Sequence, residues 1–116
     1  MSEVQIWHNP RCSKSRQAMD ILAEAGVEAE VVKYLDMDLD EEQIKELLLM
    51  LDIEARDLMR TKEDIYKEMN LANVADQGTL IRAMVRFPKL IERPIVIKDG
   101  KAVIGRPPEK IIELLK

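Results

Sequence analysis

Residues 93–105 read RPIVIKDGKAVIG, and this stretch is the strongest fold signal in the chain. Two β-branched runs flank the pair Asp99-Gly100, and such a pair favours a two-residue turn with positive φ at both residues. The stretch therefore predicts a β-hairpin. Pro107 and Pro108 then predict the start of a final helix. Its buried face is expected to consist of Ile111, Ile112 and Leu115.

The N-terminal part predicts a strand, a helix and a second strand. Residues 3–7 (EVQIW) read as a strand, residues 13–26 (SKSRQAMDILAEAG) as a helix, and residues 28–35 (EAEVVKYL) as the next strand. Gly26 suits the left-handed position just past a helix end. The interval between the strands has the length of a helical crossover, which favours a parallel β-α-β unit.

Residues 38–88 predict a helical insert. Asp40 is expected to cap one helix, with Gln43 reaching back to it, and Thr61 to cap a short helix that ends near Met69. Residues 77–87 (QGTLIRAMVRF) carry one apolar stripe. The segment is not rich in Gly, Ser or Pro, so it is not a linker.

The predicted order is β-α-β, a helical insert, then β-β-α, which is the thioredoxin-like (glutaredoxin-like) arrangement. We therefore expect an α/β fold with a four-stranded mixed sheet. Residues 1–116 are expected to form a single domain with its helical insert at about 38–88. In this arrangement a reactive cysteine sits where the first strand turns into the first helix.

The composition excludes several classes of protein. The chain has 116 residues, 47% hydrophobic and 34% charged, which is typical of one soluble globular domain. No apolar run approaches the roughly 20 residues that span a bilayer, and the N-terminus does not resemble a signal peptide. We therefore expect a cytoplasmic protein without a membrane partner. The net charge of −4 argues against nucleic-acid binding, which needs a basic surface stripe.

Residues 8–16 (HNPRCSKSR) contain the only histidine and the only cysteine of the chain. If the helix begins at Ser13, Cys12 lies at its N-terminus, where backbone N–H groups and the helix dipole stabilise an anion such as a thiolate. His8 is expected to hydrogen-bond within the loop or to add positive charge near the sulfur. Nearby cations are Arg11, Lys14 and Arg16, and the last of these follows the cysteine by one helical turn.

Other roles for Cys12 are less consistent with the sequence. A lone cysteine is more often a small buried apolar residue, but the neighbours of Cys12 are polar and charged. A cysteine phosphatase loop needs an arginine six positions later, where Ala18 stands. A dithiol or zinc site needs further cysteines or histidines, so we expect no metal. Any redox cycle on Cys12 therefore needs a thiol from another molecule.

The spacing of His8, Cys12 and Arg16 resembles the His-x3-Cys-x3-Arg motif of the glutaredoxin-linked arsenate reductases, a family of the thioredoxin-like superfamily. The resemblance spans nearly the whole chain, including residues 58–72 (LMRTKEDIYKEMNLA) and 92–115 (ERPIVIKDGKAVIGRPPEKIIELL). In many members of this family the residues around the cysteine are small and neutral. The corresponding residues here are Arg11, Ser13 and Lys14.

The resemblance implies a set of site residues. Cys12 would be the nucleophile, with His8 and Arg16 supporting its thiolate, and Pro94 would be the cis-proline that faces it. Arginine donates paired hydrogen bonds to tetrahedral oxyanions. The oxyanion-binding arginines implied by the family are Arg60, Arg93 and Arg106.

The resemblance also implies an activity, the reduction of arsenate to arsenite in arsenic detoxification. The Cys12 thiolate would attack arsenic(V), glutathione would be the co-substrate, and glutaredoxin would resolve the mixed species. No tightly bound cofactor is expected. The outside thiol that a single cysteine requires would then be glutathione.

Two other functions stay open. In the first, the chain is a different glutathione-dependent thiol oxidoreductase, in which Cys12 forms a mixed disulfide and the arginines hold carboxylates. In the second, it is a non-enzymatic regulator, because a related branch binds RNA polymerase and senses oxidation through Cys-x-x-Cys. Here Ser15 occupies the position of the second cysteine of that motif.

Overall fold

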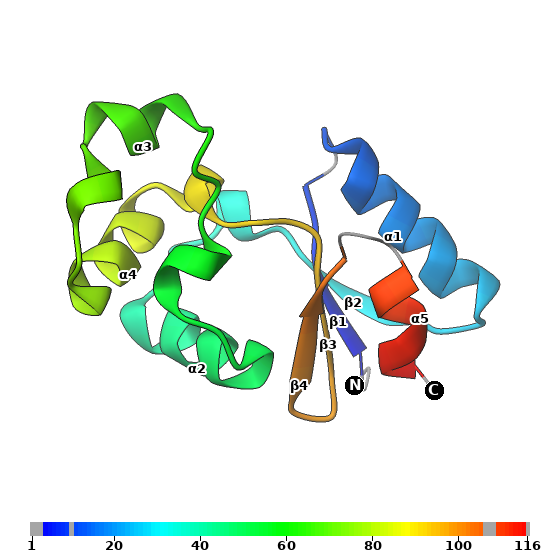
Figure 1. Cartoon of the computed structure of the whole chain (residues 1–116). Coiled ribbons are helices and arrows are strands. Elements are labelled where there is room, and N and C mark those ends of the chain that lie inside the picture. The colour runs from blue at the N-terminus through cyan, green and yellow to red at the C-terminus, as the bar shows by residue number, and fades with distance from the viewer. Residues whose placement is uncertain (1–3, 10, 106–108, 116) are drawn as a thin grey trace. The chain divides into compact units, whose positions relative to one another are not determined.

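The computed structural model describes residues 4–9, 11–105 and 109–115. The chain divides into two compact units, residues 1–36 with 93–116 and residues 37–92. All described strands belong to the first unit, and the described elements of the second unit are helical (Figure 1). The second unit corresponds to the insert expected at about 38–88. That the whole chain forms one domain stays a prediction.

The first unit is built on a four-stranded mixed sheet with the order β2-β1-β3-β4. Strand β1 (Val4–Trp7) pairs in parallel with β2 (Ala29–Val32) and antiparallel with β3 (Ile95–Lys98). Strand β3 pairs antiparallel with β4 (Lys101–Ile104). The α/β fold with a four-stranded mixed sheet is therefore confirmed.

The turn between β3 and β4 has the predicted geometry. Asp99 and Gly100 have φ values of 51° and 78°, and Lys98 pairs with Lys101 across the turn. Both central residues adopt the left-handed conformation that an Asp-Gly pair tolerates. The hairpin prediction is confirmed.

Helices α1 (Ser13–Glu24) and α5 (Glu109–Leu115) contact one another and cover the sheet of the first unit (Figure 1). The buried core between them consists of Val4, Ile6, Ala18, Leu22, Val96 and Ile111. The expected burial of Ile112 is wrong, because its side chain is 46% exposed. Successive helical residues point about 100° apart, so Leu114, three positions after Ile111, packs on the core instead.

Strand β2 is shorter than residues 28–35. It ends at Val32, and Tyr34–Asp36 form a short 3-10 helix. The ring of Tyr34 stacks on Trp7 with 5.7 Å between ring centroids, and Tyr34 is fully buried. The chain thus leaves the strand conformation before the buried ring of Tyr34.

The second unit contains helices α2 (Glu41–Leu51), α3 (Asp64–Glu68) and α4 (Gln77–Arg86). The capping box of α2 is confirmed, because Asp40 Oδ1 accepts from Gln43 N at 2.8 Å and Gln43 Oε1 accepts from Asp40 N at 2.9 Å. The cap expected at Thr61 is wrong. Helix α3 starts later, with Glu63 as its N-cap, because Glu63 N donates to Arg60 O in a preceding turn.

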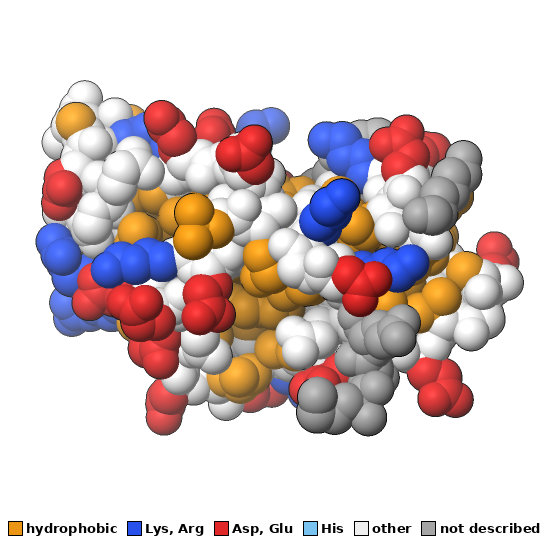
Figure 2. Space-filling model, turned by 90° about the horizontal axis from the view of Figure 1, so that it is seen from below, with side chains coloured by type: hydrophobic (Ala, Val, Ile, Leu, Met, Phe, Trp, Pro, Cys, Tyr) orange, Lys and Arg blue, Asp and Glu red, His pale blue; other side chains and the backbone are white. Residues whose placement is uncertain are grey.

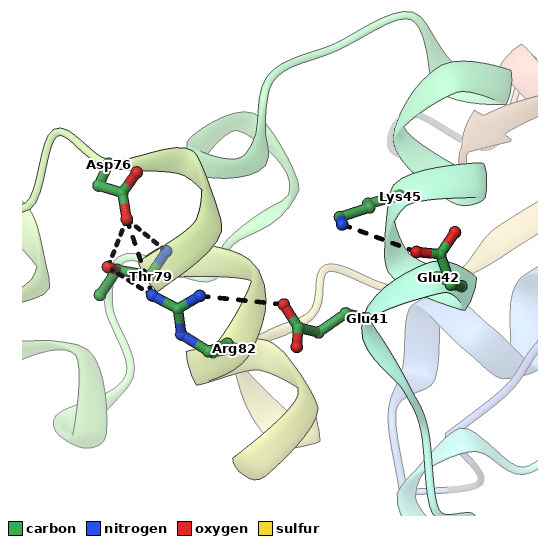
Figure 3. A network of polar contacts seen from close by, with 6 residues as sticks. All are labelled: Glu41, Glu42, Lys45, Asp76, Thr79 and Arg82. Atoms are coloured by element: carbon green, nitrogen blue, oxygen red, sulfur yellow. Dashed lines mark hydrogen bonds and ion pairs between the residues drawn. The ribbon is translucent and has the colours of Figure 1, made fainter.

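Polar contacts join helices α2 and α4 on their exposed faces (Figure 3). Asp76 caps α4 by accepting from Thr79 N at 3.0 Å and from Thr79 Oγ1 at 2.6 Å. The hydrogen bond from the Thr79 hydroxyl is the main cause that lowers the pKa of Asp76. Arg82 extends from Asp76 toward Glu41 on α2, at 3.8 and 4.0 Å. Exposed ion pairs of this kind contribute about 0–1 kcal/mol each.

Arg56 links separate segments of the second unit by hydrogen bonds. Its guanidinium donates to the Tyr66 hydroxyl at 2.5 Å and to the Leu71 carbonyl at 3.0 Å, and it also donates to the Val74 carbonyl. One side chain thus satisfies acceptors from two later segments. Separately, no helix in the described part of the chain has both the length and the apolar character that crossing a membrane requires.

Candidate active site

Cys12 is the N-cap of helix α1, which begins at Ser13 as predicted. Its backbone is extended, with φ −98° and ψ 123°, and Arg16 N donates to its carbonyl at 3.1 Å as the helix starts. The first turn of a helix has backbone N–H groups without helical partners and a partial positive charge. The position of Cys12 at the N-terminus of this helix, as the sequence predicted, is therefore confirmed.

The loop before Cys12 is held by Asn9 and Ser15. Asn9 Oδ1 accepts from Arg11 N at 3.0 Å, and Asn9 O accepts from Cys12 N at 3.0 Å. Asn9 N in turn donates to Oγ of Ser15, which is fully buried, at 3.3 Å. From the sequence, Ser15 is notable only as the place of a missing second cysteine. Asparagine commonly forms Asx turns, so the role of Asn9 in this loop could have been predicted from its residue type.

The side chain of Cys12 is buried, with 7% of its surface exposed. The three cations near it in sequence, Arg11, Lys14 and Arg16, are nevertheless exposed. None of these three forms an ion pair within the part of the chain that the structure describes. Cys12 is thus buried, whereas three cations close to it in sequence are exposed and form no ion pair with the described residues.

His8 directly follows β1, and its backbone N donates to Val32 O at 3.0 Å. Its Nδ1 is buried and has no hydrogen-bond partner among the described residues. Burial, and secondarily the charge of Lys33, lower the pKa of His8 below its usual value of about 6.5. The imidazole is therefore mainly neutral at neutral pH, which disfavours a positive charge on His8. Its support of the thiolate stays a prediction.

Strand pairing brings the Cys12 loop and the Arg93-Pro94 segment to the same end of the sheet. Trp7, the last residue of β1, lies opposite Ile95, the first residue of β3. The Arg93–Pro94 peptide bond is cis, as expected, and Arg93 is half-buried. Whether Pro94 faces Cys12 and whether Arg93 binds an oxyanion stay predictions.

The last strand ends at this same place. Ile104 pairs with Ile95, and Gly105 N then donates to Pro94 O at 2.8 Å. Gly105 is buried, and an added Cβ would lie 2.9 Å from Cγ of Pro94. Arg106, Pro107 and Pro108 lie outside the described residues, as does Pro10. The oxyanion role of Arg106 therefore stays a prediction.

Arg60 belongs to the second unit, where residues 58–60 and 90–92 run side by side. Met59 and Ile91 form an antiparallel bridge, and Arg60 N donates to Leu90 O at 2.7 Å. The guanidinium of Arg60 pairs with two carboxylates, Glu63 Oε1 at 2.7 Å from Nη1 and Glu92 Oε1 at 3.4 Å from Nε. An oxyanion on Arg60 would compete with both.

Residues 7–114 match the model of the ArsC family. The chain belongs to the ArsC family. It is 50% identical over 117 residues to an arsenate reductase of Neisseria meningitidis, covering 99% of this chain and 100% of that protein. It is also 54% identical over 115 residues to the uncharacterised Escherichia coli protein YfgD, covering 97% of each. A solved arsenate reductase from Vibrio cholerae has a TM-score of 0.92 at 46% identity and covers 95% of each chain.

This ArsC-family chain has a pocket of about 410 Å³ in its first unit, beside His8. A larger pocket, of about 700 Å³, lies in the second unit, and its apolar lining consists of Leu48, Leu49, Ile53 and Ile81. None of the predicted site residues lines the larger pocket. Figure 2 shows both charge signs interspersed with hydrophobic side chains on the face seen from below. The pocket of about 410 Å³ is lined by Asn9 and Arg11, so it lies beside the loop that carries Cys12.

Proposed function

We propose that this chain reduces arsenate to arsenite with glutathione and glutaredoxin, and that Cys12 is the nucleophile. The position of Cys12 at the N-cap of α1 is the observation that carries the proposal. The register of β1 and β3 supports it, because it brings Arg93 to the same end of the sheet. Family membership and the arsenate reductase names of close relatives also support it.

In the first step the Cys12 thiolate forms a sulfur–arsenic bond to dihydrogen arsenate. One arsenic–oxygen bond breaks, and the departing hydroxide takes up a proton and leaves as water. The helix N-terminus favours the attacking thiolate, and arginine side chains would balance the charge of the oxyanion. Arsenic remains pentavalent in the adduct.

In the second step a glutathione thiolate attacks the sulfur of Cys12. A disulfide forms between the two sulfurs, the sulfur–arsenic bond breaks, and its electron pair stays on arsenic as arsenite leaves. Glutaredoxin then attacks the mixed disulfide and restores the Cys12 thiol. The two electrons gained by arsenic come from two thiols, and Cys12 ends unchanged. One cysteine in the chain is sufficient for this cycle.

A second candidate function is a thiol oxidoreductase that exchanges glutathione mixed disulfides without arsenate. Disulfide exchange at Cys12 forms no oxyanion adduct and does not need Arg60, whose ion pairs with Glu63 and Glu92 would compete with arsenate. Both functions use the same nucleophile. They differ in whether turnover depends on the oxyanion.

The test is arsenate-dependent NADPH oxidation in the presence of glutathione, glutaredoxin and glutathione reductase. The wild type should turn over, Cys12→Ser should be inactive, and Ser13→Ala, a neighbouring exposed change, should retain activity. Absence of arsenate-dependent turnover in the folded wild type would exclude arsenate reduction. Turnover of a glutathione mixed disulfide by the same sample would then favour the second candidate.

A further inference from the structure

We infer that the pocket beside His8 anchors the thiol co-substrate, and that this co-substrate is a small peptide carrying two carboxylates and one ammonium group. Glutathione has this charge pattern. The inference rests on the proposed function in one respect, which is that Cys12 reacts with a thiol from another molecule. The residues that line the pocket are His8, Asn9, Arg11, Lys33, Leu35 and Asp36.

The sheet explains why these residues meet. Strands β1 and β2 are parallel neighbours, and His8 N extends their pairing by donating to Val32 O at 3.0 Å. The segments that follow the two strands therefore leave the sheet at the same end, the carboxyl end of both strands. Crevices at the carboxyl ends of parallel strands are where open α/β sheets bind ligands. Because Arg11 directly precedes Cys12, a ligand held here lies beside the segment that carries the nucleophile.

The charges of the pocket complement those of the ligand. Arg11 and Lys33 are exposed cations, and neither forms an ion pair with any described residue. Asp36, also exposed and not in a described ion pair, supplies one negative charge at the same pocket. Two cations and one carboxylate match two carboxylates and one ammonium.

The remaining lining suits a peptide. His8 and Asn9 add polar residues to the lining. Leu35 adds an apolar surface that is 40% exposed. The volume of about 410 Å³ lies within the range of small-molecule sites, roughly 300–1,000 Å³.

The test separates anchoring from chemistry by using S-methylglutathione, which has no thiol. Its binding to the full-length Cys12→Ser protein is measured by calorimetry. We expect saturable binding, weakened about threefold or more by Arg11→Gln and by Lys33→Gln in the same background. Asp36→Asn should weaken it as well. The diethyl ester of S-methylglutathione, which lacks both carboxylates, should bind more weakly than the parent.

Lys14→Gln is the matched control, because it removes one exposed positive charge near Cys12 from a residue that does not line the pocket. It should change the affinity less than twofold, because an exposed charge that does not contact the ligand contributes little. Absence of saturable binding, or equal affinities for the Arg11→Gln, Lys33→Gln and control variants, would overturn the inference.

Turnover distinguishes this inference from the proposed function. In the arsenate assay, Lys33→Gln should raise the KM for glutathione and leave the KM for arsenate unchanged. Arsenate turnover with an unchanged glutathione KM would overturn the anchoring role alone. Pocket-dependent binding of S-methylglutathione without arsenate turnover would support the anchoring role and exclude arsenate reduction alone.

Discussion

The guanidinium of Arg60 lies 2.7 Å from the carboxylate of Glu63, measured from Nη1 to Oε1. Glu92 contributes a second carboxylate at 3.4 Å from Nε, and all three side chains are about one quarter exposed. Two negative charges thus surround one positive charge. The two carboxylates outweigh the single guanidinium charge, so the cluster repels an approaching oxyanion unless one of the carboxylates moves away or is neutralised.

Replacing Glu63 by glutamine should therefore strengthen binding of an oxyanion to Arg60. The isosteric change removes one competing charge, and a partly exposed ion pair contributes about 0.2–1 kcal/mol, which corresponds to an affinity gain of up to about fivefold. The measurement is the KM for arsenate. Glu68→Gln, an exposed change in helix α3, is the control. Equal KM values for the two variants would contradict a binding role for Arg60.

Ser15→Ala should loosen the loop that carries Cys12. The change removes the acceptor of Asn9 N at a fully buried position, which costs about 1–3 kcal/mol in the free energy of unfolding. Because Cys12 is only 7% exposed, a looser loop should also speed its alkylation by iodoacetamide. Chemical denaturation and alkylation rates measure the two effects. Ser13→Ala, at an exposed position, should change neither, and identical behaviour of the two variants would exclude this role.

Gly105→Ala should destabilise the first unit. A Cβ at this position would lie 2.8 Å from Cδ1 of Ile111 and 2.9 Å from Cγ of Pro94, and overpacking of this kind costs about 1–3 kcal/mol. Gly78→Ala is the opposite control. Its Cβ would lie 3.4 Å from its nearest neighbour, the Arg82 side chain, and alanine is a better helix former than glycine. Thermal unfolding should shift in opposite directions, and equal shifts would refute the packing argument.

His8 should titrate below its usual pKa, and as the only histidine its imidazole signals are unambiguous by NMR. The unfolded state then binds the proton more tightly than the folded state. Stability therefore falls as the pH drops from about 6.5 toward the folded pKa, and above about 6.5 the His8 proton causes no further pH dependence. Lys33→Gln should raise the pKa of His8, because it removes the nearby positive charge. His8→Gln should remove this part of the pH dependence of unfolding, and a pKa at or above 6.5 would contradict the burial of the imidazole.

Features governed by neighbouring residues were predictable from the sequence. The turn at Asp99 and Gly100, the start of α1 after Cys12 and the capping box of Asp40 all have their predicted form. Each depends on backbone geometry or hydrogen bonds within about four positions. The cap at Thr61 failed because a preceding turn accepts the Glu63 N–H, which delays the helix.

The order of the elements, the hairpin and the position of Cys12 at a helix N-terminus could be predicted from the sequence, because local turn and cap chemistry is encoded within a few residues. The tertiary structure was needed to show which residues line the pocket beside the Cys12 loop and, within the second unit, which carboxylates pair with Arg60. Arg60 meets Glu92 because two distant segments of the second unit pair, and Lys33 lines the same pocket as Arg11 because β1 and β2 are parallel neighbours. Such contacts depend on which segments pair, and no local pattern specifies that.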